Sequence, residues 1–252
     1  LDRIGVHYQL VRTPWDFRHE MQSGVYGQYW LLGDLQELSS PAYNELVELT
    51  NAGQNTLFDS GTHQWLNKYL NQVVGVKYNG RLLLDTGEIN LNPYYLPTPT
   101  DPQIANSKLI ATTSMQGRPF ANNWAVILTP QNNNIQSFAT FSVNQNPSQT
   151  GNQSNHPNQP YHALSANKYG NGIPVTAAFD IVQSLDFARK SALPPYKDNA
   201  NTAQLHWDSV LEQLLRARTI KARSEYVPNE PVKIPLNLIN EANSERRIQV
   251  DV

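Results

Sequence analysis

The stretch on which the fold prediction turns is residues 119–167, PFANNWAVILTPQNNNIQSFATFSVNQNPSQTGNQSNHPNQPYHALSAN, which contains no Lys, Arg, Asp or Glu. Its first half holds two apolar runs, 123–129 and 135–143, separated by Pro130 and three asparagines. Such runs around a turn predict an antiparallel β-hairpin. The second half is polar and amide-rich, so it cannot supply a core. We therefore expect a hairpin at 123–143 followed by one long exposed loop at 144–169.

Before this stretch, the sequence predicts strands and two helices. Aromatic and polar positions alternate in residues 1–38, which favours two or three strands broken at Thr13-Pro14. The periodicity then changes to that of a helix at 41–51, with Ser40 as its expected N-cap, and again at 62–73. Asn79-Gly80 lies between two apolar runs, a pattern typical of a type I′ turn, so we expect a second hairpin at 74–85.

After the polar loop, the sequence becomes mainly helical. One helix is expected after Ile173-Pro174 and ends before Pro194, and another covers about 203–223. The apolar residues beyond Pro228 alternate as in one more strand, and they are Val232, Ile234, Leu236 and Leu238.

These elements together predict an α+β fold: a mostly antiparallel sheet with about four helices packed on it and one long polar loop. We expect a single domain over 1–252. A subdivision into 1–145, 146–172 and 173–252, hinged in the polar loop, stays open as an alternative.

Composition excludes several classes of function. The net charge of −2 gives no concentrated positive field, so neither nucleic acid nor an anionic membrane surface is an expected partner. The absence of Cys excludes a disulfide scaffold, a thiolate metal site and a Cys nucleophile. No apolar run is long enough for a transmembrane segment. Low charge, abundant amides and the lack of Cys favour an extracytoplasmic location, either periplasmic or in a virion or extracellular complex.

Two aspartates are candidates for catalysis. Asp59 lies in LFDSGT and Asp85 in LLLDTGE. Both segments resemble the Asp-Thr/Ser-Gly turn of aspartic peptidases, and that resemblance implies a pair of carboxylates that share one proton. The second segment departs from the family pattern at Glu88. The two aspartates are only 26 positions apart, too few for one lobe each. The preferred interpretation is therefore structural: Asp59 caps the helix at 62–73 and Asp85 closes a hairpin turn.

The candidate binding residues are tyrosines, one amide and two histidines in segments rich in Pro and Asn. Exposed tyrosines beside amides are used to bind sugars and protein partners, although tyrosines of this kind also anchor loops to the core. The two histidines have no standard metal-ligand spacing, so no metal or other cofactor is expected. The set comprises Tyr94, Tyr95, Asn152, His156, Tyr161, His162 and Tyr169.

The sequence therefore predicts a non-catalytic structural or assembly protein of an extracytoplasmic complex, such as an envelope or secretion-apparatus component or a virion protein. It would act by contact with other protein subunits, in a homo- or hetero-oligomer. One alternative is a relative of the aspartic peptidases that uses Asp59, Asp85 or both. Another is a carbohydrate-binding module.

Overall fold

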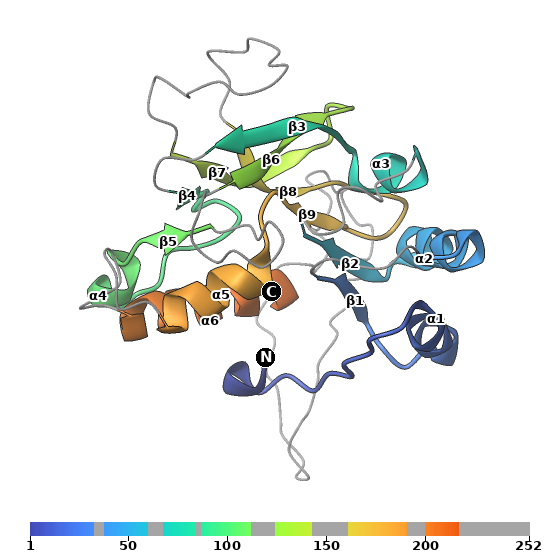
Figure 1. Ribbon diagram of the computed structural model, residues 1–252, viewed down its shortest axis with the longest axis horizontal. Coiled ribbons are helices and arrows are strands. Elements are labelled where there is room, and N and C mark those ends of the chain that lie inside the picture. Colours follow the sequence, from blue (N-terminus) through green and yellow to red (C-terminus); the bar gives the residue numbers. More distant parts are fainter. Residues whose placement is uncertain are drawn as a thin grey trace, which may run out of the picture.

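The chain forms an α+β fold around a seven-stranded sheet, seen in the computed structural model of Figure 1. The structure describes residues 1–32, 38–59, 68–83, 87–111, 124–142, 161–190 and 200–216. The strands are β1 (Gln28–Leu31), β2 (Asn55–Phe58), β3 (Val76–Leu83), β4 (Glu88–Leu91), β5 (Leu109–Ile110), β6 (Trp124–Pro130), β7 (Gln136–Phe141), β8 (His162–Ala166) and β9 (Val175–Ala177). The helices are η1 (Asp2–Ile4), α1 (Pro14–Ser23), α2 (Ser40–Ala52), α3 (Lys68–Val74), α4 (Pro102–Ala105), α5 (Ile181–Lys190) and α6 (Ala200–Arg216).

The main sheet is mixed, so the prediction of a mostly antiparallel sheet is wrong. Its strand order is β1-β2-β9-β8-β7-β4-β5. The first three strands are parallel and the remaining neighbours are antiparallel. A parallel pair needs a crossover connection, and α2 supplies it between β1 and β2. The short buried runs of β2 and β9 lack the alternation by which a half-exposed strand is found in a sequence.

Both predicted hairpins are also wrong as pairings. β3 runs unbroken through Asn79 and Gly80, and its register against β6 shifts between Tyr78 and Arg81. The Asn-Gly pair thus marks a bulge in a long strand instead of a turn. β6 and β7 do follow one another around a turn, as expected, but β6 joins β3 in a separate two-stranded sheet, whereas β7 pairs with β4 and β8.

The helices agree better with the sequence. α2 confirms the helix expected at 41–51 and ends at Gly53, but its N-cap is Ser39 and not the expected Ser40, which is already the first helical residue. α3 and α6 confirm the helices expected at 62–73 and 203–223 as far as the described residues extend. α5 starts only at Ile181, because β9 takes up the residues before it. The described residues contain six α-helices against the four expected.

The two helices that were not expected are the short α4 and α1, and α1 lies in a region where strands were expected. Thr13 is its N-cap: the Thr13 hydroxyl accepts a hydrogen bond of 3.1 Å from the backbone N–H of Asp16. Pro14 stands in the first turn, where its missing N–H costs nothing. Thr13-Pro14, which was expected to be a break between strands, is therefore the start of a helix.

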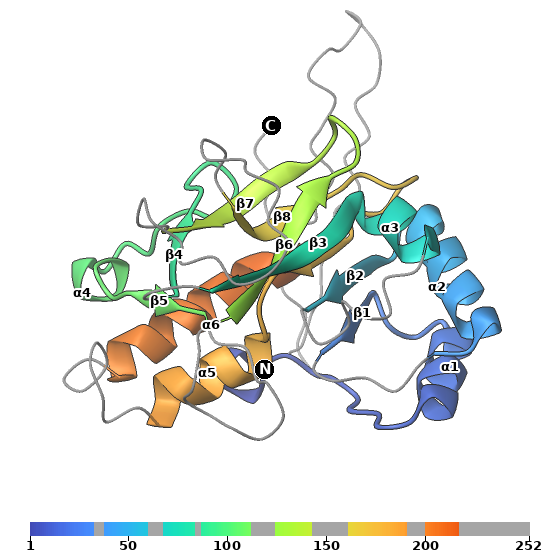
Figure 2. The same ribbon diagram turned by 45° about the horizontal axis from the view of Figure 1, so that its top comes forward.

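The helices cover both faces of the sheet at its parallel end, as Figures 1 and 2 show. Side chains alternate along β1. Tyr29 points toward α1, where its ring meets the ring of Phe17 edge-on. Its hydroxyl donates a hydrogen bond of 3.5 Å to the carbonyl oxygen of Met21. Gln28 points the other way, and its Nε2 donates to the carbonyl oxygen of Leu215 in α6 at 2.9 Å. A single cluster of buried apolar residues runs through both layers.

No helix among the described residues is long and apolar enough to cross a membrane. The expected exposed loop at 144–169 is wrong for its last part, because residues 162–166 form the largely buried strand β8, which lies between β9 and β7 in the sheet. Residues 144–160 of the expected loop lie outside the described part of the chain. The single-domain prediction for 1–252 stays a prediction, because residues 217–252 lie outside the described part of the chain.

Candidate functional site

Polar residues gather at one edge of the main sheet, where the parallel strands β2 and β9 end. Phe58 is paired with Thr176, and Leu164 with Ala177, so the carboxyl ends of β2 and β9 lie level with the amino end of β8. We call this the carboxyl edge and define it by Asp59, Asp180 and His162. Ligands of open sheets with parallel strands bind outside the carboxyl ends of those strands. The carboxyl edge is therefore the candidate functional site.

Asp59 follows the last residue of β2 and is buried, with 1% of its surface exposed. Its backbone N–H donates to the carbonyl oxygen of Leu31 at 3.2 Å, which continues the β1–β2 ladder by one residue. The helix that the sequence analysis expected it to cap begins, in the described residues, only at Lys68. Asp59 is thus held in place as the end of a buried parallel strand.

Asp180 stands at the start of α5 and acts as its N-cap. The Asp180 carboxylate accepts a hydrogen bond of 2.9 Å from the backbone N–H of Gln183, and its carbonyl oxygen accepts one of 2.6 Å from the Ser184 hydroxyl. Burial raises the pKa of Asp180 above its ordinary value, while hydrogen bonds from the backbone of Gln183 and Val182 oppose that rise. Its first role is to satisfy the orphan donors of the helix.

His162 is the first residue of β8 and is half-buried. Burial lowers the pKa of its imidazole, which favours the neutral ring at pH 7. Its Nδ1 is buried and has no hydrogen-bond partner among the described residues. A neutral imidazole with an available nitrogen can accept or donate a proton.

The carboxyl edge thus holds a carboxyl group of raised pKa, an imidazole of lowered pKa and a second buried aspartate. Groups whose surroundings move their pKa values in this way are candidates for acid–base chemistry. In the described part of the chain, no three His, Asp or Glu side chains are placed to hold a metal ion.

The predicted binding residues do not form one site. Tyr161 and His162 lie at the carboxyl edge. Tyr94, Tyr95 and Tyr169 lie at the opposite ends of the strands, past the ends of β4 and β8. Tyr95 stacks on Phe138 of β7, with ring centroids 5.0 Å apart, and therefore anchors its loop. Asn152, His156 and the second candidate aspartate, Asp85, lie outside the described residues.

The sequence did not point to Asp180 or to the buried contact of His206. Asp180 directly precedes the apolar-periodic run of α5, so the cap rule could have identified it. His206 is 5% exposed and lies in the middle of α6, where its Nδ1 is 3.0 Å from the carbonyl oxygen of Ser107. No local sequence signal reports this contact between residues 99 positions apart.

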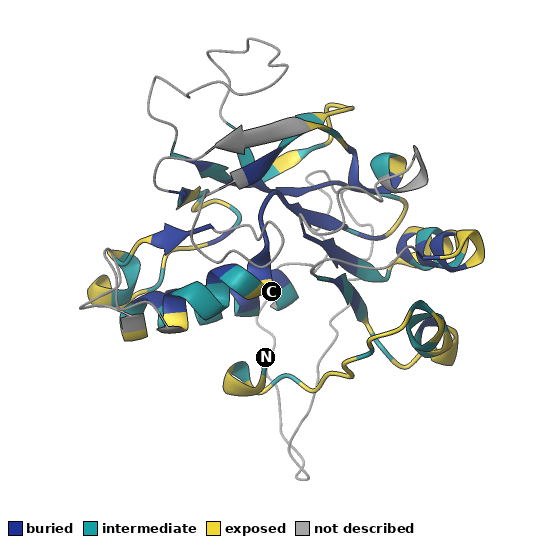
Figure 3. Cartoon of the chain, in the orientation of Figure 1, coloured by how far each residue is buried: buried dark blue, intermediate teal, exposed yellow. Residues whose placement is uncertain are grey.

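Large apolar side chains are exposed at the start of the chain. Figure 3 shows this region as mostly exposed. Of the six large apolar side chains found exposed among the described residues, four belong to residues 8–25, and we call these the N-terminal apolar set: Tyr8 (46% exposed), Leu10 (66%), Trp15 (74%) and Val25 (76%). Trp15 stacks on His19 one helical turn later, at 5.7 Å between ring centroids.

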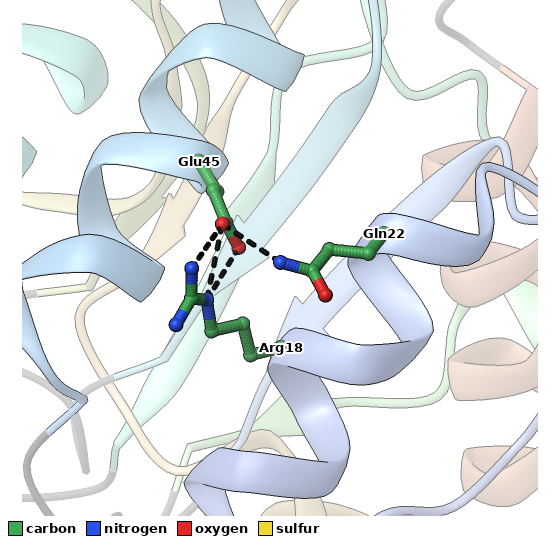
Figure 4. A network of polar contacts seen from close by, with 3 residues as sticks. All are labelled: Arg18, Gln22 and Glu45. Atoms are coloured by element: carbon green, nitrogen blue, oxygen red, sulfur yellow. Dashed lines mark hydrogen bonds and ion pairs between the residues drawn. The ribbon is translucent and has the colours of Figure 1, made fainter.

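An ion pair fixes the helix that carries Trp15. Arg18 of α1 donates through Nε and Nη2 to the carboxylate of Glu45 in α2, at 2.9 and 2.7 Å, and Gln22 donates to the same carboxylate at 2.9 Å (Figure 4). This forked pairing matches the planar guanidinium to the carboxylate. α1 is thereby attached to α2 by polar contacts, while Phe17 of α1 packs against the buried core and against Tyr29 of β1.

Comparison with known proteins gives no family. No protein-family model matches the chain, and no curated protein matches it. Among solved structures, an exo-beta-1,4-mannosidase from Opitutaceae bacterium strain TAV5 matches over 83% of this chain and 34% of its own, at 14% identity and a TM-score of 0.47. A cytoplasmic protein from Salmonella typhimurium LT2 matches over 82% and 76%, at 14% identity and a TM-score of 0.41.

A third match is Gan42B, a GH42 beta-galactosidase from G. stearothermophilus, at 13% identity and a TM-score of 0.41. It covers 68% of this chain, and this chain spans about a fifth (21%) of the enzyme's length. All three TM-scores are below 0.5 and all three identities are below 15%. These likenesses therefore carry no argument about function.

Proposed function

We propose that this chain is a non-catalytic contact protein of an extracytoplasmic assembly and that it binds other protein subunits through its N-terminal apolar set. The observation that carries the proposal is the exposure of two large apolar side chains. Trp15 is 74% exposed and Leu10 is 66% exposed. Exposed tryptophans and tyrosines are the residues that most often anchor protein interfaces. The location is supported by composition: no Cys and a charged fraction of only 16%.

Within this set, Trp15 lies on α1, a helix that is fixed at both its start and its side. α1 is capped by Thr13 and paired to α2 through Arg18 and Glu45, so Trp15 is presented without an ordering step. Pre-organised contacts lose less conformational entropy on binding. Burying the open surface of an aromatic residue contributes about 25 cal/mol per Å² before those costs are subtracted.

The experiment is a measurement of molar mass in solution by light scattering over a hundredfold range of protein concentration. We expect an oligomer that the double variant Leu10→Ser, Trp15→Ser dissociates. The matched control is Tyr94→Ser, which removes an aromatic side chain of similar exposure (68%) from the other end of the sheet. A chain that stays monomeric at the highest concentration, or an oligomer that both variants weaken equally, would contradict the proposal.

A second candidate function is favoured by the carboxyl edge. The buried Asp59, together with Asp180 and His162, gathers acid–base groups where parallel strands end. The corresponding activity is peptide hydrolysis by an aspartic-type mechanism that uses Asp59, with or without Asp85. Pepstatin-sensitive cleavage of a denatured protein near pH 4, abolished by Asp59→Asn in a chain that still folds, would support this candidate over the contact function.

A further inference from the structure

β1 forms one outer edge of the seven-stranded sheet. The carbonyl groups of Gly27 and Leu31 accept hydrogen bonds from β2, from the N–H groups of Asn55 and Asp59. Backbone groups alternate in direction along a strand, so the N–H and C=O groups of Gln28 and Trp30 point away from β2. Among the described residues, no backbone group bonds to them.

The chain leaves its last described helix at this edge. The first half of α6 lies against β5, and His206 in the middle of the helix contacts Ser107, two residues before that strand. Near the end of α6, the carbonyl oxygen of Leu215 accepts a hydrogen bond of 2.9 Å from the side chain of Gln28, the first residue of β1. α6 therefore crosses from one outer strand of the sheet to the other (Figure 2). The last described residues of the chain therefore lie beside β1.

The sequence after α6 contains the pattern of an edge strand. In PVKIPLNL, residues 231–238, the apolar residues occupy the even positions, and both prolines, Pro231 and Pro235, occupy odd ones. In a strand, residues of one parity share both a face and a hydrogen-bonding direction. If the even residues bond to a neighbouring strand, both prolines face solvent, the only arrangement in which a sheet accepts them.

We propose that residues 231–238 of this same chain add to the outer edge of β1 as a further strand. The segment runs antiparallel to β1, so the outward groups of Gln28 and Trp30 bond to even-numbered residues directly opposite them. The apolar side chains of those residues then share the α6 face of the sheet with Gln28 and Trp30. Fifteen residues lie between Leu215 and Pro231. At roughly 3.3 Å per extended residue they span about 50 Å, several times the length of a four-residue strand. The connection from α6 is therefore long enough for residues 231–238 to pair with β1.

The test is residue-resolved hydrogen exchange by NMR on the full chain. The amides of Gln28 and Trp30 are expected to exchange slowly, as do those of Tyr29 and Leu31, which bond into β2. The variant Ile234→Pro, which places a proline on the inward-facing parity, should speed exchange at Gln28 and Trp30 about tenfold or more, because their hydrogen bonds open locally. Tyr29 and Leu31 serve as the internal control.

The matched variant is Lys233→Pro, which places a proline on the outward-facing parity and should leave all four amides protected. Fast exchange at Gln28 and Trp30 in the unmodified chain overturns the proposal. Slow exchange that survives Ile234→Pro also overturns it, since another segment then covers the edge. Protection that disappears on dilution assigns the edge to a second copy of the chain and overturns docking within one molecule.

Discussion

The Nδ1 atom of His206 lies 3.0 Å from the carbonyl oxygen of Ser107, and this contact joins the middle of α6 to the residues before β5. A carbonyl oxygen only accepts, so a hydrogen bond to it requires the imidazole proton on Nδ1. Its Nε2 is then a buried lone pair with no partner among the described residues. A second proton would have to enter at that buried position, and burial accordingly lowers the pKa of His206.

The chain is therefore expected to lose stability as the pH falls below 6.5. The unfolded histidine takes up a proton near pH 6.5, whereas the folded one does so only at lower pH. The free energy of unfolding is therefore unaffected by this histidine above pH 6.5. Below pH 6.5 it decreases, by up to about 1.4 kcal/mol per pH unit for each such histidine, until the folded imidazole is also protonated. His162 acts in the same direction.

Urea unfolding between pH 8 and pH 5 measures this slope. His206→Gln keeps a donor for Ser107 and should reduce the slope without abolishing it, because His162 remains. An unchanged slope in the variant would show that His206 is not the titrating group.

Asp180 is expected to stabilise α5 as its N-cap, while its buried negative charge destabilises the folded chain. Asp180→Ala removes the acceptor for the N–H of Gln183 and should destabilise the chain by about 1 kcal/mol. Asp180→Asn keeps the cap and removes the buried charge. Because the raised pKa of Asp180 means that its ionised form is less stable in the folded chain, the Asn variant should match or exceed the parent at pH 7.

Chemical unfolding of both Asp180 variants at pH 7 distinguishes the two effects. Equal losses for Ala and Asn would mean that the negative charge, and not the cap, is what Asp180 contributes.

Arg18→Lys should loosen α1 without unfolding the chain. Arg18 donates to the Glu45 carboxylate through two nitrogens, Nε and Nη2. A lysine has one ammonium nitrogen, so it can keep only one of these two contacts. We expect faster amide exchange in α1 and an unchanged midpoint of global unfolding. The control is Arg189→Lys, at an exposed pair of residues three apart, which should change neither quantity. A large drop in the midpoint for Arg18→Lys would contradict this expectation.

Gly75→Ala should destabilise the chain far more than Gly5→Ala. Both glycines have a positive φ, of 70° and 69°, so the backbone strain of about 1–2 kcal/mol is shared. A Cβ at Gly5 meets nothing within 4 Å, whereas one at Gly75 presses on the side chains of Ile135 and Asn167. Overpacking adds roughly 1–3 kcal/mol. Thermal unfolding of the two variants measures the difference, and equal shifts would rule out the packing contribution.

The helices could be predicted because their signals are local. α2 follows from a Ser-Pro start, one apolar stripe and Gly53, all within a short window. α1 shows the limit: its Thr13 cap and Pro14 were present, but the alternating aromatic residues around them favoured strands. The sheet order could not be predicted, because the pairing of Leu57 with Val175 depends on contacts that no short window contains.

The candidate site could be predicted only in part. Asp59 was selected for its resemblance to a peptidase turn, yet its position is that of a residue ending a parallel strand. Its neighbours at the carboxyl edge, Asp180 and His162, come from the other half of the chain. Because the order of the strands brings these residues together, the site can be predicted from the sequence only when that order is known.

The insertion of β9 and β8 between β2 and β7 has a consequence for biosynthesis. Asn55 and Ile173, joined by a hydrogen bond at the β2–β9 junction, are 118 residues apart in sequence. While the chain is being made, β2 therefore has no neighbour on its inner side until residue 175 has left the ribosome. During that interval the first two strands present an open apolar ribbon, which makes nascent chains targets for chaperones and for premature association.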